Sequence, residues 1–186
     1  MKRLFDIVLS FVLIILLLLP MILIAIAVKA SSQGRALYWS DRVGKDNIIF
    51  RMPKYRSMIF NTPAVATHLL QNPEHNLTSI GNFLRKYSID ELPQLWNIIK
   101  GEMSFVGPRP ALFNQEDLIN LRSTKGVDKL LPGLTGWAQI NGRDELPIVD
   151  KVKMDEEYLE KKSFLFDLKI LWLTFMKVIK RDGISH

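Results

Sequence analysis

The sequence predicts a mostly α fold with few short strands, in which an apolar N-terminal segment enters a membrane and the rest forms one compact unit at the membrane surface. Two observations lead to this prediction. Residues 7–28 carry no charged side chain, and several later stretches repeat apolar residues at helical three- and four-residue spacing. There is no long alternation of strands and helices, no GxGxxG segment and no Walker loop, which argues against a Rossmann-like fold. With 186 residues and 48% hydrophobic content, the chain has the size of one domain and is too apolar to be disordered.

The apolar run from Ile7 to Val28 is long enough to form a membrane helix. A straight helix of this length would extend about 33 Å, which is enough to cross the hydrocarbon core. The run is too long for the apolar region of a typical signal peptide, and Ala25 to Ala30 offers only a weak cleavage site. Insertion into a membrane is therefore the better interpretation.

Flanking charges and one proline distinguish a spanning helix from a hairpin. Lys2 and Arg3 precede the run, and the basic residues that follow it are Lys29, Arg35 and Arg42. Because both flanks are basic, the positive-inside rule favours no direction of crossing, and both ends can stay cytoplasmic. Pro20 removes a helical hydrogen bond near the middle of the run. We therefore predict a re-entrant helix-break-helix hairpin over residues 1–35 and a single structural unit over residues 36–186.

Local patterns predict several further elements. Ile48 to Arg51 is predicted to be a short strand. Thr62-Pro63 is the cap and first-turn pairing of a helix, which we predict over Thr62 to Leu70, with a polar loop from Gln71 to Thr78. Pro132 to Arg143 is rich in glycine, which indicates a turn-rich loop whose backbone approaches another part of the molecule closely.

The last helix is predicted over Phe164 to Ile179. A buried core helix is the ordinary interpretation of its apolar positions. The lysines toward its C-terminal end, together with a net charge of +6, instead favour an amphipathic helix that lies on an anionic leaflet. The same charge would suit nucleic acid, but the apolar N-terminal run makes a membrane the better explanation. No nucleic-acid partner is therefore predicted.

The most informative segment of the chain runs from Ser88 to Pro110. Its helical part is indicated by apolar residues at three- and four-residue spacing, namely Leu92, Leu95, Trp96 and Ile99. Gly101 stands where such a helix would stop.

The start of this helix has two possible registers. Ser88 and Glu91 match a capping box, but Pro93 would then fall beyond the first turn and delete a hydrogen bond. Asp90 fits better as the cap, because Pro93 then lies among first-turn amides that have no intrahelical partner. In both registers the two carboxylates lie at the positive end of the helix dipole. We therefore predict a modestly lowered proton affinity and an ionised Asp90 at neutral pH.

Adjacent acids in a first turn are ordinary capping residues, and only their surroundings favour chemistry. Arg85 precedes the pair and Arg109 follows it, so one short segment combines carboxylates with phosphate-binding cations. An aspartate such as Asp90 can attack phosphorus as a covalent nucleophile, and the neighbouring Glu91 can hold a Mg²⁺ ion that neutralises phosphate charge. The pair is therefore our candidate catalytic site.

Further cations are candidates for holding phosphate groups. Arg109 offers a planar fork suited to two phosphate oxygens, and Pro108 and Pro110 on either side reduce its backbone freedom. Lys54 and Arg56 follow the predicted strand, and at least one of them is expected to face a phosphate, unless both are solvated surface charges.

Composition limits the other chemistries. The absence of cysteine excludes disulfides, thiolate metal sites and a cysteine nucleophile. The three histidines, His68, His75 and His186, show no ligand-like spacing. We therefore expect no histidine-based mechanism and place these residues at the surface.

The order of these motifs resembles that of the monotopic bacterial phosphoglycosyl transferases, a family of bacterial sugar transferases. The matching pieces are K-R-L-F-D-I before the apolar run with its central proline, K-Y-R-S-M from Lys54, L-R-K-Y-S-I-D-E-L-P-Q from Leu84, the stretch from Gly101 to Pro110, and P-G-L-T-G-W-A-Q-I-N-G-R from Pro132. They cover nearly the whole chain. Tyr55, where phenylalanine is common, and Leu19, where serine is often found before the proline, depart from the pattern.

The resemblance implies a two-step reaction on the cytoplasmic face of the bacterial inner membrane. Asp90 would attack a UDP-sugar, release UMP and form an aspartyl-phosphosugar, which undecaprenyl phosphate, a polyprenol phosphate, then attacks. It further implies that Glu91 binds Mg²⁺, and that Arg143 is a second phosphate or sugar contact. Membrane lipids and downstream glycosyltransferases are the remaining implied partners.

Two alternatives stay open from the residues alone. A membrane-bound aspartyl-phosphate phosphatase or pyrophosphatase would use the same chemistry with water as the acceptor. A non-catalytic basic membrane adaptor would use the acids only as helix caps.

Overall fold

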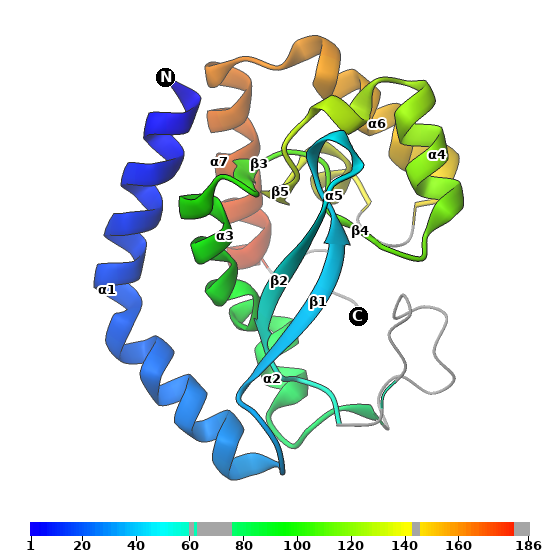
Figure 1. The fold of residues 1–186 in the computed structure, drawn as a ribbon. Coiled ribbons are helices and arrows are strands. Elements are labelled where there is room, and N and C mark those ends of the chain that lie inside the picture. Colours follow the sequence, from blue (N-terminus) through cyan, green and yellow to red (C-terminus); the bar gives the residue numbers. More distant parts are fainter. Residues whose placement is uncertain (60–61, 63–75, 143–145, 181–186) are drawn as a thin grey trace.

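The structure is a computed structural model that describes residues 1–59, 62, 76–142 and 146–180 of the chain. Within these residues the fold is mostly helical with few short strands, as the sequence predicted. Figure 1 shows one long N-terminal helix along the side of a unit that holds the other elements. The helix predicted over Thr62 to Leu70, the first part of the loop after it, and the three histidines lie outside the described residues.

Helix α1, Lys2–Ser31, contains the whole apolar run. Its most apolar window has a mean hydropathy of 3.4 and is only 6% buried, so its length and composition would allow it to cross a membrane. The helix continues through Pro20 and bends in its course (Figure 1). The predicted break is therefore a bend within one continuous helix, because the loss of one hydrogen bond at a proline bends a helix without ending it when its neighbours keep theirs.

The larger sheet is antiparallel and has the strand order β2-β1-β4. Its strands are β1, Leu37–Val43, β2, Ile49–Tyr55, and β4, Ala111–Leu112; the short 3₁₀ helix η1, Lys45–Asn47, joins the first two. The predicted strand from Ile48 is the first part of β2, which reaches Tyr55 although it contains Pro53. Proline is tolerated there because β2 lies at the edge of the sheet. Strand β1 was not predicted.

Three short helices follow the antiparallel pair β1–β2 along the chain. They are α2, Gly81–Lys86, the 3₁₀ helix η4, Ile89–Gln94, and α3, Leu95–Lys100. Helix α3 ends at Gly101, whose φ of 88° is left-handed, as the sequence predicted. The predicted start is wrong. Asp90 lies inside η4 and is not a cap; Ser88 occupies the cap position without a side-chain cap bond, and Pro93 is accommodated in the 3₁₀ turn.

The second sheet pairs β3, Ser104–Val106, with β5, Gly133–Thr135, in parallel. The remaining elements are α4, Glu116–Thr124, η5, Val127–Lys129, α5, Trp137–Ile140, α6, Ile148–Lys161, and α7, Phe164–Lys180. The segment from Pro132 is thus a strand and a short helix rather than a loop. The predicted close approach is confirmed: a Cβ atom on Gly133 would collide with the backbone of Gly107. The predicted C-terminal helix is also confirmed.

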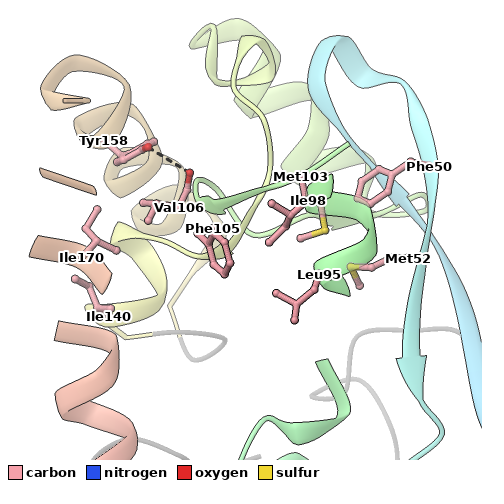
Figure 2. Packing of buried hydrophobic residues seen from close by; sticks show 10 residues of the cluster. All are labelled: Phe50, Met52, Leu95, Ile98, Met103, Phe105, Val106, Ile140, Tyr158 and Ile170. Atoms are coloured by element: carbon pink, nitrogen blue, oxygen red, sulfur yellow. Dashed lines mark hydrogen bonds between the residues drawn. The ribbon is translucent and has the colours of Figure 1, made fainter. Parts of the chain in front are cut away.

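The core joins strand β2 and helix α3 to helices α5, α6 and α7 (Figure 2). Its ten buried residues are Phe50, Met52, Leu95, Ile98, Met103, Phe105, Val106, Ile140, Tyr158 and Ile170. Ile98 from α3 and Ile170 from α7 are completely buried. Phe105 and Val106 of β3 belong to the same core, so β3 connects β2, which carries Lys54, with helices α5, α6 and α7.

Polar contacts fasten the N-terminal end of α1 to this unit. Lys2 Nζ donates to the Val106 carbonyl at 2.9 Å, to the Tyr158 hydroxyl at 3.1 Å and to Asp167 Oδ2 at 2.6 Å. The Tyr158 hydroxyl donates to Asp167 Oδ1 at 2.6 Å. We call Lys2, Tyr158 and Asp167 the anchor cluster. Arg3 adds bonds to two carbonyls at the end of α3, which compensates the negative end of that helix.

The other end of α1 is fastened to the same unit. Arg56 donates to the backbone carbonyls of Ser32 and Gln33, directly after the helix. The Tyr55 hydroxyl donates to the Met21 carbonyl at 2.8 Å, one residue past Pro20. Both ends of α1 therefore contact the same unit.

Candidate active site

Four of the residues selected from the sequence come together at the end of β2. Lys54 Nζ donates to Glu91 Oε1 at 2.7 Å, and Arg109 Nη2 donates to the same oxygen at 3.2 Å. Asp90 is the neighbour of Glu91 in η4, which packs against β2. We call Lys54, Asp90, Glu91 and Arg109 the site cluster.

Asp90 is only 7% exposed. Burial raises its pKa from 3.8 to about 6, and the negative charge of Glu91 acts in the same direction. The cations Lys54, Arg85 and Arg109 oppose this rise. The predicted lowering of its proton affinity is therefore wrong, because desolvation outweighs the dipole of a short helix. A pKa of about 6 still leaves Asp90 mostly ionised at neutral pH.

Lys54 lies beside the acidic pair with its side chain 16% exposed. Burial lowers its pKa, and the negative charge of Glu91 partly offsets that effect. Burial and the nearby guanidinium groups therefore favour the neutral amine of Lys54, whereas the carboxylates of Glu91 and Asp90 favour its charged form.

Arg42 on β1 is a further cation that the sequence analysis did not assign to the site. Its charge acts on Lys54, and its Nη1 donates to the Pro110 carbonyl at 3.2 Å. The sequence analysis counted it only among the charges that follow the apolar run. The signal that would have found it is the pairing of β1 with both β2 and β4, which requires the unpredicted strand.

The other cations predicted to bind phosphate differ in whether they lie near the site cluster. Arg85, at the end of α2, acts electrostatically on Asp90 and belongs with the site cluster. Arg56 does not, because its guanidinium group is bound to the chain after α1. Arg143 lies outside the described residues.

The loop Pro108-Arg109-Pro110 is fixed through its backbone. The Pro108 carbonyl accepts a hydrogen bond from the Gly133 amide at 2.9 Å, so the glycine-rich segment packs directly on this loop. The absence of a Cβ at Gly133 makes this contact possible. The described part of the glycine-rich segment therefore contacts the Pro108-Arg109-Pro110 loop through the backbone of Gly133.

The described residues include no cluster of three or more His, Cys, Asp or Glu side chains that could enclose a metal ion. A magnesium ion does not require such a cage, because it is commonly bound by one or two carboxylates together with substrate phosphates. Asp90 and Glu91 supply carboxylate oxygens of this kind. The residues therefore fit a magnesium ion that binds together with a phosphorylated substrate.

The site brings a buried carboxylate, a second carboxylate and several cations together beside a membrane-type helix. The described fold and site thus combine a helix long and apolar enough to cross a membrane with a cluster of carboxylates and cations. The chain matches the bacterial sugar transferase family over residues 1–181. It belongs to that family, and the resemblance found in its motifs is confirmed.

Curated relatives cover almost the whole chain. It is 43% identical over 186 residues to the UDP-glucose:undecaprenyl-phosphate glucose-1-phosphate transferase of Escherichia coli, which covers 95% of this chain and 40% of the relative. It is 37% identical over 201 residues to the UDP-galactose-lipid carrier transferase of Erwinia amylovora, covering 98% of this chain and 41% of the relative. The chain thus spans about two fifths of these relatives. It is also 38% identical over 187 residues to the uncharacterized sugar transferase EpsL of Bacillus subtilis, covering 100% of this chain and 91% of EpsL.

Proposed function

We propose that this chain transfers a sugar 1-phosphate from a UDP-sugar to undecaprenyl phosphate and releases UMP. The observation that carries the proposal is the buried Asp90 beside Glu91, with Lys54 and Arg109 bound to Glu91. Two relatives support the same acceptor, since the proteins of E. coli and Komagataeibacter xylinus are named as glucose phosphate transferases acting on undecaprenyl phosphate.

The reaction proceeds in two displacements at the β-phosphorus of the donor. An Asp90 oxygen attacks this phosphorus, the bond to the bridging oxygen breaks, and the electron pair leaves with UMP. A phosphate oxygen of the lipid then attacks the same phosphorus, and the bond to Asp90 breaks to regenerate the carboxylate. Division into two steps lets a water-soluble donor and a lipid acceptor use one site in turn.

The cations around the acidic pair supply the electrostatic part of catalysis. Lys54, Arg85 and Arg109 all act electrostatically on Asp90, which supports a role for them in neutralising the charge that would develop on the transferred phosphoryl group. Glu91 would hold Mg²⁺, which supplies further charge neutralisation on the phosphates when bound. Removal of divalent cations with EDTA should abolish turnover, and added MgCl₂ should restore it.

We further propose that α1 is re-entrant and that the catalytic unit lies on the cytoplasmic face of the inner membrane. The support is geometric: Lys2 and Arg3 at one end and the residues after Ser31 at the other contact the same unit. A helix that crossed the membrane would have to break one set of contacts. The bend in α1 and its exposed apolar side chains suit insertion into one leaflet.

This topology is testable because the chain has no cysteine. We expect a cysteine inserted before Lys2 and a separate Lys125→Cys variant to react only when the reagent reaches the cytoplasm. Labelling of the first position from the periplasm alone would contradict the re-entrant topology.

The experiment that tests the function measures UMP release from a panel of UDP-sugars with Mg²⁺, with and without undecaprenyl phosphate. Intact mass of the protein after incubation with donor alone tests the covalent intermediate. We expect a sugar-phosphate increment that Asp90→Asn abolishes, and turnover that requires the lipid. Release of free sugar phosphate without lipid would indicate a hydrolase instead, and an Asp90→Asn variant with full function would indicate an adaptor.

A further inference from the structure

The Pro108-Arg109-Pro110 loop presents an unusual anchoring problem. Proline has no backbone N–H, so two of its three residues cannot donate a hydrogen bond. The loop is held through acceptors instead, because each of its three carbonyls receives a hydrogen bond. The donors are the Gly133 amide to Pro108, Arg122 Nη1 to Arg109 at 2.8 Å, and Arg42 Nη1 to Pro110.

The bond to the middle carbonyl comes from a buried ion pair between two helices. Arg122 on α4 donates through Nε and Nη2 to Asp155 Oδ2 on α6, at 3.0 and 2.6 Å. The Arg122 and Asp155 side chains are 9% and 2% exposed. With Nε and Nη2 bound to the carboxylate, the remaining Nη1 points at the Arg109 carbonyl, so the planar fork fixes one direction for that bond.

We propose that the Arg122–Asp155 pair is a positioning device that acts on catalysis through the backbone of Arg109. This inference rests on the proposed function, in which Arg109 contacts the transferred phosphate. The pair touches neither Asp90 nor Glu91 in any described contact. Its effect on the reaction passes through the carbonyl of the residue whose side chain donates to Glu91.

The chemistry of the pair explains why both members are needed. A lysine at position 122 would keep the charge but could not direct two donors at Asp155 and a third at the loop. An asparagine at position 155 would leave the arginine buried without its carboxylate partner, so its orientation would no longer be fixed. Either change should loosen the Arg109 carbonyl while the acidic pair stays intact.

The test is a double-mutant cycle on UMP release with donor and lipid, using Arg122→Lys, Arg109→Gln and the double variant. We expect Arg122→Lys to lower kcat roughly 10- to 100-fold with a smaller change in KM, because misplacement weakens transition-state contacts most. The double variant should be no slower than Arg109→Gln alone. Additive losses would overturn the proposal, since they would mean that Arg122 acts independently of Arg109.

Lys125→Gln is a matched control, because Lys125 forms a 3.1 Å ion pair with Glu156 between the end of α4 and the same α6, but both side chains are partly exposed. It should leave turnover unchanged. Hydrogen exchange of residues 104–112 gives a readout that needs no activity, and exchange there should be faster in Arg122→Lys and in Asp155→Asn. If the unmodified protein releases no UMP, the proposed function fails, and hydrogen exchange alone then decides whether the Arg122–Asp155 pair holds the loop. Unchanged exchange in both variants would overturn the positioning role of the pair.

Discussion

The anchor cluster and the site cluster use the same chemical groups for different ends. In the anchor cluster, one lysine meets a carbonyl, a hydroxyl and a carboxylate, and the hydroxyl donates in turn to the carboxylate. In the site cluster, the cations Lys54 and Arg109, with Arg85 and Arg42 nearby, act on only two carboxylates. The first arrangement balances its donors and acceptors within the protein, whereas the second holds an excess of positive charge.

Burial sharpens the contrast. Asp167 and Asp90 are 6% and 7% exposed, so both side chains are almost completely removed from solvent. Asp167 receives hydrogen bonds from Lys2 and Tyr158, whereas the pKa of Asp90 is raised to about 6 by its desolvation. A carboxylate that is destabilised by its own fold and surrounded by cations is suited to react with a phosphate. The comparison predicts that mutations in the two clusters will change stability in opposite directions.

The largest expected effect belongs to Asp90→Asn. Loss of the proposed nucleophile should lower UMP release by at least about 10³-fold. Its thermal midpoint should nevertheless rise by on the order of 5 °C at pH 7.5, because the buried charge is removed. The sign follows from linkage: a folded pKa above the ordinary value makes the native state bind protons more tightly, so stability is lost as pH rises toward 6.

At pH 4 the same variant and the unmodified protein should therefore unfold at similar temperatures. Thermal scans at both pH values check this, with Asp117→Asn, on the exposed face of α4, as a control that should change neither midpoint. A lower midpoint for Asp90→Asn at pH 7.5 would mean that its charge stabilises the fold, and the contrast between the clusters would disappear.

Lys2→Met should act in the opposite direction. It leaves the buried Asp167 with the Tyr158 hydroxyl but without its cation, and because the Lys2 side chain is 38% exposed we expect the free energy of unfolding to fall by about 2 kcal/mol, between the values for buried and surface pairs. Urea unfolding in detergent measures the change. Lys100→Met, which removes an exposed pair with Glu102, should lower the same free energy by less than about 1 kcal/mol. Equal effects of the two variants would show that the anchor cluster contributes no more than a surface pair.

The pH dependence of the reaction sharpens the role of Asp90. Because only the ionised carboxylate attacks phosphorus, kcat/KM for UMP release should fall about tenfold per pH unit below about 6 and level off above it. Measurement between pH 5 and pH 8 checks this. A break near 4, the ordinary value for aspartate, would show that burial does not raise the pKa.

Tyr158→Phe should give the smallest effect. The change removes the hydroxyl that accepts from Lys2 and donates to Asp167, but Lys2 remains to bind the carboxylate. We expect a loss of about 1.5 kcal/mol in the free energy of unfolding. Tyr38→Phe, at an exposed position on β1, is the control and should change this free energy little. A loss as large as that of Lys2→Met would mean that the hydroxyl, not the lysine, is the centre of the anchor.

Local sequence determined the features that depend on neighbours along the chain. The apolar run gave α1, Gly101 gave the end of α3, and the periodicity after Phe164 gave α7, because hydrogen bonding and burial in a helix involve residues three and four apart. The pairing of carboxylates with flanking cations was also visible, since Asp90, Glu91 and Arg109 lie within one short segment.

Tertiary structure alone decided which charges meet and how they titrate. Lys54 belongs to the site and Arg56 to the end of α1, although they are two residues apart, because β2 ends at Tyr55 and Arg56 lies beyond the strand, where it contacts the residues after α1. The pKa of Asp90 follows from desolvation by residues distant in sequence, which outweighs the local helix dipole. Arg42 and Arg122 reach the Pro108-Arg109-Pro110 loop only through strand pairing and helix packing. Such contacts depend on how the chain closes in space, and no pattern of nearby residues specifies them.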